Sequence, residues 1–312
     1  MNSRQTLAGC FPIVLLAFIG GISLVSGLAL HARASAPSPL IITWGSNTPE
    51  WDQKLHVSAI RIGCSDTPAS CMKEVRATAK DHRKVFLSVL LKADTSPSYG
   101  AQYGQLSLHE SALAGVGIDD FVTQYERLFH GGAQNPQSIL GEMIAGTKVN
   151  PHLGFGLTLY EDELQSPYVS DEDFPAHLRA DVDYIHFYLH YRTDTPHIAD
   201  YVRQVKAIFP NAKVILGVYA YDRISYLPCS RHGQPCTAQQ ELDFLRQGLD
   251  IDLGLVKSGE AAGIEFYPGS FGLENNWSGW NAPRICPGRK SDCIQNTDQM
   301  RQVVAQEFSK EF

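Results

Sequence analysis

The sequence lacks several short motifs that mark common enzyme classes. It contains no G-x-S-x-G segment, no G-x-x-x-x-G-K-[ST] loop and no H-E-x-x-H pair, which argues against serine hydrolases of the elbow type, P-loop enzymes and zincins. It also has no internal repeat, low-complexity linker or run of like charge, so we expect one domain after the N-terminal segment. Basic residues are few, 26 against 33 acidic ones, for a net charge of −7. That balance argues against a nucleic-acid partner, because phosphates require a basic surface.

The N-terminus has the pattern of an export signal. Arg4 precedes an uncharged apolar run from Phe11 to Leu30, and small residues follow as far as Ala36. A basic start, an apolar centre and an A-x-A exit predict a secretory signal peptide over residues 1–34, with residues 35–312 as the mature domain. The run could also span a bilayer, so an uncleaved membrane anchor is the alternative. We expect a monomer that is secreted, periplasmic or, in the second case, bound to a membrane.

Seven cysteines are present, and one of them, Cys10, lies inside the predicted signal. The other six form three pairs with the same separation of seven positions, each pair spanning a loop with Pro or Gly. Such equal spacings favour local disulfides over zinc sites, whose cysteines are usually closer together, and an exported chain meets an oxidising compartment. The predicted bridges are Cys64 with Cys71, Cys229 with Cys236 and Cys286 with Cys293.

Apolar and β-branched runs alternate with stretches of helical spacing along the rest of the chain. The expected strands are 40–44, 59–63, 85–91, 153–160, 184–189, 213–221 and 263–267, and the expected helices are 71–83, 119–129, 136–145, 198–209 and 238–257. This alternation implies parallel strands with right-handed crossovers. It predicts an α/β fold, a (β/α)8 TIM-like barrel whose eighth strand is hidden near 102–117 or after 271. A doubly wound open sheet is the alternative, although no Gly-rich turn follows the first strand.

Strand alternation directs an unusual set of polar side chains into the predicted barrel. The barrels of this class are normally filled by branched aliphatic residues, and charged groups are costly to bury unless they are paired. Two interpretations are open. The side chains form either a satisfied internal network without chemistry or a polar, aromatic-lined cleft that binds sugar. The residues expected to bind substrate are Trp44, Arg61, Lys92, Tyr160, Tyr188, His190, Tyr221, Asp222 and Tyr267.

Cleavage of a glycosidic bond requires two carboxyl groups, and the sequence offers them at strand ends. Glu265 is the leading candidate, because a lone carboxylate in an apolar strand either pairs with Arg61 or Lys92 or works in catalysis. Glu161 and Asp162 directly follow another strand, and one of them is the expected catalytic partner.

The histidines give no metal-binding pattern. His186 and His190 are four positions apart on a strand, which separates them by about 13 Å, too far to share an ion. We therefore expect no metal and no cofactor.

Together these residues give the chain a resemblance to secreted glycoside-hydrolase-like (β/α)8 barrels, as an unassigned bacterial family. It is similar in strand order to the large clan whose two carboxylates come from the ends of strands four and seven, here the segments LTLYEDEL and GIEFYPGSFG. The resemblance implies a glycoside hydrolase acting on an oligo- or polysaccharide, with carbohydrate as the partner. A non-catalytic carbohydrate-binding barrel of the same fold is the alternative function.

Overall fold

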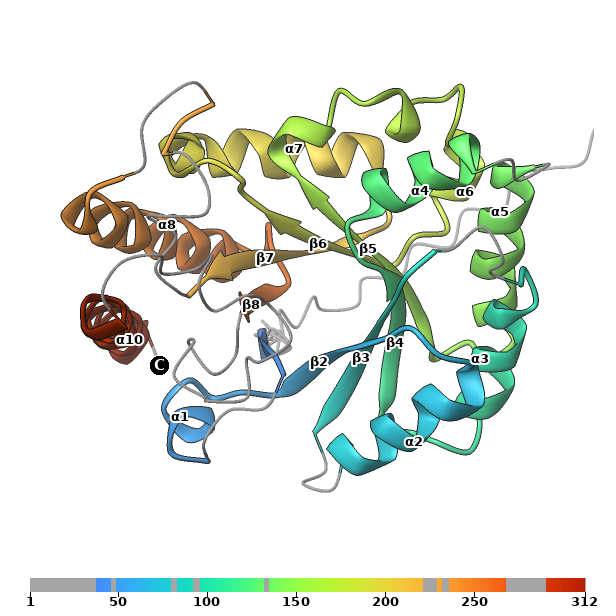
Figure 1. The fold of residues 1–312 in the computed structure, drawn as a ribbon, viewed down its shortest axis with the longest axis horizontal. Helices are drawn as coiled ribbons and strands as arrows, with labels where there is room; N and C mark the ends of the chain where they lie inside the picture. Colours follow the sequence, from blue (N-terminus) through green and yellow to red (C-terminus); the bar gives the residue numbers. More distant parts are fainter. Residues whose placement is uncertain are drawn as a thin grey trace, which may run out of the picture. The chain divides into compact units, whose positions relative to one another are not determined.

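A computed structural model describes residues 38–45, 49–79, 83–91, 96–131, 135–220, 229–231, 236–267 and 290–311, without the side chains of 290–298. In these ranges eight parallel strands close into one barrel, each paired with the next and the last with the first (Figure 1). This confirms the predicted (β/α)8 TIM barrel in a single domain. The strands are β1 (Leu40–Trp44), β2 (Ala59–Cys64), β3 (Lys84–Val89), β4 (Leu113–Ile118), β5 (Gly154–Tyr160), β6 (Tyr184–Tyr188), β7 (Lys213–Tyr219) and β8 (Gly263–Tyr267).

Helices lie around the outside of the strands (Figure 1). They are α1 (Pro49–Lys54), α2 (Pro68–Thr78), α3 (Tyr99–Ser107), α4 (Phe121–His130), α5 (Pro136–Thr147), α6 (Ala176–Arg179), α7 (Ile198–Ile208), α8 (Ala238–Ser258) and α10 (Lys290–Glu311), with 3-10 turns η2 (Glu161–Glu163), η3 (Pro167–Val169) and η4 (Arg192–His197). The five predicted helices correspond to α2, α4, α5, α7 and α8. The pattern missed α3, because its glycines weaken the helical signal. Gly100 is nevertheless required there, since a Cβ would lie 2.1 Å from the Met143 carbonyl oxygen on α5.

The hidden eighth strand is β4, which overlaps the first of the two predicted places. Its sequence, LAGVGI, contains two glycines, which are rare in strand interiors. Close packing explains them, because a Cβ on Gly117 would lie 2.7 Å from the Gly156 carbonyl oxygen. The position of β4 corrects the strand numbering: LTLYEDEL contains the end of β5 and the turn after it, and GIEFYPGSFG begins with β8, so the expected carboxylates do not come from strands four and seven.

The barrel interior changes from apolar to polar along the strands. Ile42, Ala59, Phe86 and Ile215 form a buried apolar cluster within it. Arg61 lies two residues beyond Ala59 on β2, and the polar layer begins at this level. Because side chains at the C-terminal ends of barrel strands face the opening between the βα loops, the polar layer lies just beneath that opening, here called the mouth.

Two of the three predicted disulfides are present in the described residues. Cys64 at the end of β2 is bonded to Cys71 on α2, and Cys229 is bonded to Cys236 between β7 and α8. The pair Cys286 and Cys293 lies outside the described side chains. Disulfides are typical of proteins in oxidising compartments, and they suggest an extracytoplasmic protein.

The predicted export signal, residues 1–34, also lies outside the described part of the chain. Within the part that is described, no helix is both long enough and apolar enough to cross a membrane.

Helix α8 packs against the barrel through a row of buried side chains, and one of these side chains is an aspartate. Leu245, Leu249 and Asp252 are spaced by three or four residues, and Asp252 is only 4% exposed. Among the residues that the structure describes, none forms a hydrogen bond with its Oδ1. It lines a cavity of about 30 Å³ between α8 and strands β6 and β7, room for about two water molecules. Burial raises the pKa of Asp252 well above its ordinary value.

Replacing Asp252 with leucine should stabilise the protein in a pH-dependent way. The folded state keeps the Asp252 proton while the unfolded state releases it, so the wild type loses stability as the pH rises above about 4. We expect the free energy of unfolding of the variant to be higher by about 1–3 kcal/mol at pH 7, with a smaller difference near pH 4. Urea unfolding at both pH values measures this, with exposed Asp250→Asn as the control on the same helix. If the free energies of unfolding of Asp252→Leu and the wild type differed by the same amount at both pH values, that result would contradict a raised pKa for the buried Asp252.

Candidate active site

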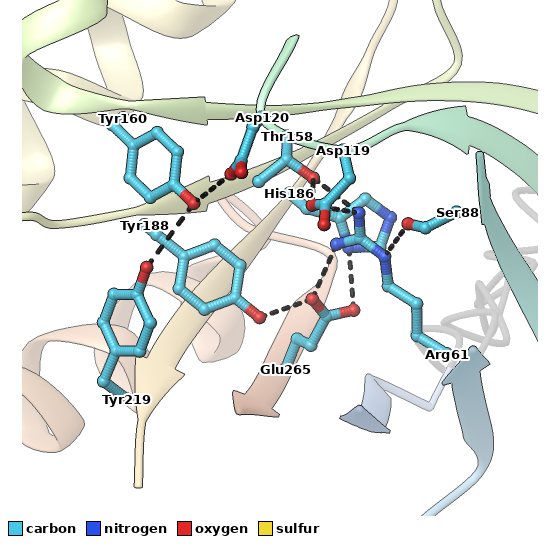
Figure 2. A network of polar contacts seen from close by, with 10 residues as sticks. All are labelled: Arg61, Ser88, Asp119, Asp120, Thr158, Tyr160, His186, Tyr188, Tyr219 and Glu265. Carbon is cyan, nitrogen blue, oxygen red and sulfur yellow. Dashed lines mark hydrogen bonds and ion pairs between the residues drawn. The ribbon is translucent and has the colours of Figure 1, made fainter. Parts of the chain in front are cut away.

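Arg61 is the centre of a buried polar network beneath the mouth (Figure 2). Its Nε donates to Ser88 Oγ at 2.7 Å, and its Nη1 donates to Glu265 Oε1 at 2.8 Å. Its Nη2 donates to Thr158 Oγ1 at 2.5 Å and to Asp119 Oδ1 at 3.2 Å. These partners belong to β3, β8, β5 and the end of β4, so one guanidinium joins five strands of the barrel.

Glu265 is completely buried in this network. Tyr188 Oη donates to its Oε1 at 2.5 Å. His186 Nδ1 lies 2.9 Å from its Oε2, without the alignment of a hydrogen bond. Burial alone would raise the pKa of Glu265, but the Arg61 charge, aided by His186 and Tyr188, lowers it to about 2. Glu265 is therefore ionised at neutral pH. It forms a buried ion pair with Arg61, the first of the two alternatives that the sequence left open. None of its surface is open to a substrate.

Asp119 is the more accessible carboxyl group of the network. It directly follows β4, its side chain is 28% exposed, and its Oδ1 also accepts a hydrogen bond from Thr158 Oγ1 at 3.0 Å. Burial raises the pKa of Asp119 more than the Arg61 guanidinium lowers it, and the neighbouring Asp120 adds to the rise. Asp119 thus combines access from the mouth with a tendency to hold its proton.

Asp119 and Glu265 bind different terminal nitrogens of the same guanidinium. Their nearest oxygens are therefore separated by less than about 9.5 Å, the upper limit for the carboxyl pairs of glycosidases. The two groups also differ in protonation, because one pKa is raised and the other is lowered. Opposite shifts in neighbouring carboxyl groups are typical of acid and base assignments in active sites.

A second group of contacts surrounds Tyr160 (Figure 2). Tyr160 Oη donates to Asp120 Oδ1 at 2.7 Å, and Tyr219 Oη lies 3.5 Å from Tyr160 Oη. Asp120 adopts a left-handed backbone conformation with φ 42°, at the turn from β4 into α4. That conformation is uncommon outside glycine, although Asp tolerates it better than most residues. The turn places two consecutive carboxyl groups at the mouth.

The turn η2 after β5 sends Glu161 and Asp162 to different partners. Glu161 accepts the backbone N–H groups of His190 at 2.7 Å and Tyr191 at 3.0 Å. Asp162 Oδ1 lies 2.9 Å from His190 Nδ1. Burial raises the pKa of Glu161; burial acts likewise on Asp162, but its His190 bond prevails and lowers that pKa. Neither carboxylate contacts Glu265 among the described residues, so the structure does not join the pair that the sequence suggested.

Aromatic side chains gather at the mouth. The Trp44 ring lies 4.3 Å from the Arg61 guanidinium carbon and meets the Tyr267 ring edge-on at 5.7 Å. The Tyr160 and His190 rings are stacked at 3.8 Å with 13° between their planes. Tyr188 is buried beneath them, 5.0 Å from the Tyr219 ring. Flat rings with polar tips are suited to stack on sugar rings while their hydroxyl groups bind polar atoms.

Three predicted substrate-binding residues, Lys92, Tyr221 and Asp222, lie outside the described part of the chain. Conversely, sequence reasoning missed Asp119 and Asp120, because their strand was not recognised. The available signal was a pair of aspartates directly after an apolar segment.

The residues Glu161, Asp162 and His190 form a group that could hold a metal ion, with one ligand atom from each within 4.8 Å of the others. The sequence did not predict this group, because Glu161 and Asp162 lie far from His190 along the chain. Carboxylate and imidazole ligands suit several divalent transition metals. Glu161 also holds two backbone N–H groups, so the same geometry has a structural use without an ion.

No protein-family model matches the chain, and no curated protein matches it. Among solved structures, it is similar to the family 17 β-1,3-glucanosyltransferase of Rhizomucor miehei, at 13% identity and a TM-score of 0.48 over 73% of this chain and 86% of that one. It is also similar to the GH113 β-mannanase of Alicyclobacillus acidocaldarius, at 11% identity and a TM-score of 0.46 over 88% and 97% of the two chains.

The catalytic domain of a Pyrococcus furiosus chitinase is a third similar structure, at 11% identity and a TM-score of 0.46 over 74% of this chain and 84% of that one. The chain thus has a distant structural similarity to glycoside hydrolase barrels and no family assignment. The resemblance predicted from strand order is confirmed at this level.

Proposed function

We propose that the protein is an exported enzyme that hydrolyses glycosidic bonds of an oligo- or polysaccharide at the mouth of its barrel. One observation carries the proposal: Arg61 binds both a buried, ionised Glu265 and a partly exposed Asp119 whose pKa is raised. Such hydrolysis requires a carboxyl group that holds a proton for the leaving oxygen, and the Arg61–Glu265 ion pair fixes the position of Asp119 for that role.

In this proposal Asp119 is the proton donor. Its position at the end of β4 supports the role, because barrel enzymes build their active sites from residues at the C-terminal ends of the strands. Its 28% exposure gives a leaving oxygen access to the carboxyl group. Thr158 and Arg61 hold the carboxyl group in place through bonds to one of its oxygens, Oδ1.

Glu265 acts through Arg61 rather than on the sugar. It is fully buried beneath Tyr188 and Arg61, so its role is to fix and neutralise the guanidinium that also holds Asp119. This assignment takes up the pairing with Arg61 that the sequence left open for Glu265, in place of a direct catalytic role. Trp44, Tyr219 and Tyr267, which are partly exposed, supply the ring faces on which sugar units stack.

The test is a hydrolysis screen of the mature protein against β- and α-linked glucans, mannans, chitin oligomers and xylans, with release of reducing ends as the measurement. We expect cleavage of at least one class by the wild type. A protein that binds glycans in the same panel but releases no reducing ends would contradict the proposal.

The second candidate function is a carbohydrate-binding barrel without catalysis. The complete burial and pairing of Glu265 favours it, because the carboxylate singled out by the sequence has no access to a substrate. Calorimetric binding without turnover in the same panel would distinguish this candidate from the enzyme.

A further inference from the structure

Asp120 occupies the N-cap position of α4, but its side chain does not cap that helix. An aspartate at this position usually accepts a backbone N–H from the first helical turn. Among the described residues, no N–H group of α4 donates to the Asp120 side chain. Its Oδ1 instead accepts the Tyr160 hydroxyl at 2.7 Å. The carboxyl group of Asp120 is therefore turned away from its own helix and toward β5.

The backbone at Asp120 produces this direction. Consecutive side chains of an extended chain point to opposite faces, but Asp120 lies in the left-handed region, with φ 42° and ψ 54°. As a result Asp119 and Asp120 both contact β5. A left-handed conformation is costly for a residue other than glycine, and such strain is found most often at functional sites.

One face of β5 holds the two aspartates next to one another (Figure 2). Thr158 and Tyr160 are two positions apart on this strand, so their side chains share a face, with about 7 Å between their backbones. Thr158 Oγ1 donates to Asp119 Oδ1 at 3.0 Å, and Tyr160 Oη donates to Asp120 Oδ1 at 2.7 Å. When two carboxyl groups share a site, the charge of one favours the protonated form of the other.

Tyr160 is itself held rigidly. Its side chain is largely buried, and its ring is stacked on the His190 ring at 3.8 Å. Its backbone N–H donates to Glu163 Oε2 at 3.1 Å. The Tyr160 hydroxyl is therefore a fixed donor, and it determines where the Asp120 carboxyl group lies.

The contacts of Asp119 show which of its oxygens carries the proton. In the described part of the chain both bonds to Asp119, from Arg61 and Thr158, go to Oδ1, which leaves the proton to Oδ2. Burial raises the pKa of Asp119, the Arg61 charge lowers it, and Asp120 raises it further. Glu265, on the same guanidinium, adds a smaller rise. The charge of Asp120 thus opposes the charge of Arg61 at Asp119.

We infer that Asp120 and Tyr160 are positioning residues of the reaction, an inference that rests on the proposed function. Tyr160 fixes Asp120, and the negative charge of Asp120 keeps the transferable proton on Asp119 in the free enzyme. Neither residue acts on the sugar, because both act through Asp119.

Glu163 is the other titratable group near Asp120. Burial raises the pKa of Glu163 to about 8, and the charge of Asp120 adds to the rise. Each comparison below is therefore repeated in a Glu163→Gln background. Glutamine keeps an oxygen that can accept the Tyr160 backbone N–H, and it does not titrate.

The experiment measures kcat/KM as a function of pH on a glycan that the wild type cleaves. The alkaline limb of this profile reports the loss of the Asp119 proton in the free enzyme. Asp120→Asn removes the charge, and asparagine tolerates the left-handed backbone. We expect the limb to move to lower pH by about one pH unit, a loss of about tenfold above the limb. On the acid side of the limb, kcat/KM should equal that of the wild type.

Tyr160→Phe removes only the hydroxyl group and keeps the ring that stacks on His190. It should move the limb in the same direction but less far, because Asp120 keeps its charge and loses its anchor. In the Asp120→Asn background it should have no further effect on the limb. Tyr125→Phe is the matched control, since it removes a buried hydroxyl group of α4 that donates to the Asp173 carbonyl oxygen at 2.9 Å. It should leave the limb unchanged.

Two results would overturn the inference and leave the hydrolase proposal intact. One is an Asp120→Asn variant that cleaves the glycan with an unmoved alkaline limb. The other is a loss of equal size at every pH, which would indicate direct action on the substrate or a disturbed fold. If Asp120→Asn does not fold, an unmoved limb in Tyr160→Phe would overturn the inference instead. A wild type that cleaves no glycan would overturn both proposals.

Discussion

Asp119→Asn should lower kcat/KM on a natural glycan by about 10²–10⁴-fold, the usual contribution of a general acid. The asparagine keeps an oxygen that can accept the bonds from Arg61 and Thr158, so the network that positions residue 119 should persist. What the variant loses is the proton for the leaving oxygen. The measurement is steady-state hydrolysis of the glycan class that the wild type cleaves.

The control for this variant is Asp181→Asn, which removes an exposed carboxyl group after α6. It should have wild-type activity. Thermal unfolding of Asp119→Asn should lie within a few degrees of the wild type, because Glu265 still balances the Arg61 charge. An Asp119→Asn variant that is fully active, or one that has lost activity only because it no longer folds, would contradict the assignment.

Glu265→Gln should destabilise the folded protein by about 3–5 kcal/mol, the usual cost of removing one partner from a buried ion pair. The variant leaves the Arg61 guanidinium buried without its ionised partner, since the remaining carboxyl group, Asp119, tends to hold its proton. The sequence left open whether Glu265 pairs with Arg61 or works in catalysis, and the complete burial of the residue supports the ion pair. Urea unfolding followed by circular dichroism measures the difference.

The pH dependence of this difference tests its electrostatic origin. The pKa of Glu265 is lowered to about 2 in the folded state, while an unfolded glutamate has a pKa of about 4.3. The stabilisation is thus present above pH 4.3 and is lost as the pH falls toward 2. It amounts to about 3 kcal/mol by linkage. A difference between wild type and Glu265→Gln that stays constant from pH 7 to pH 3 would contradict the ion-pair account.

The sequence predicted the fold because alternating apolar runs and helical spacing require parallel strands with crossovers. It placed β4 only approximately, since Gly115 and Gly117 look like turn residues until the packing of Phe86 and Gly156 against them is known. The approximate placement of β4 also explains why part of the candidate site was not predicted. Without that strand, the aspartates after β4 had no structural context, and the strands that carry Glu161 and Glu265 received the wrong numbers.

The interior residues were predicted more successfully than their roles. Strand alternation identified Arg61, Tyr188 and Glu265 as facing inward, and the structure brings them into direct contact. Alternation cannot say how deep a side chain lies, so it could not separate the buried Glu265 from a carboxyl group open to the mouth. It also could not show that Glu161 turns to the backbone beyond β6, because that contact joins two loops.

The most direct test of the central claim is to compare Asp119→Asn on a natural glycan and on a dinitrophenyl glycoside of the same sugar. Dinitrophenolate leaves without a proton, so a variant that lacks only the general acid should keep activity on this substrate. We predict near wild-type rates on the dinitrophenyl glycoside and a loss of about 10²-fold or more on the glycan. Equal losses on the two substrates would contradict the role of Asp119 as the proton donor.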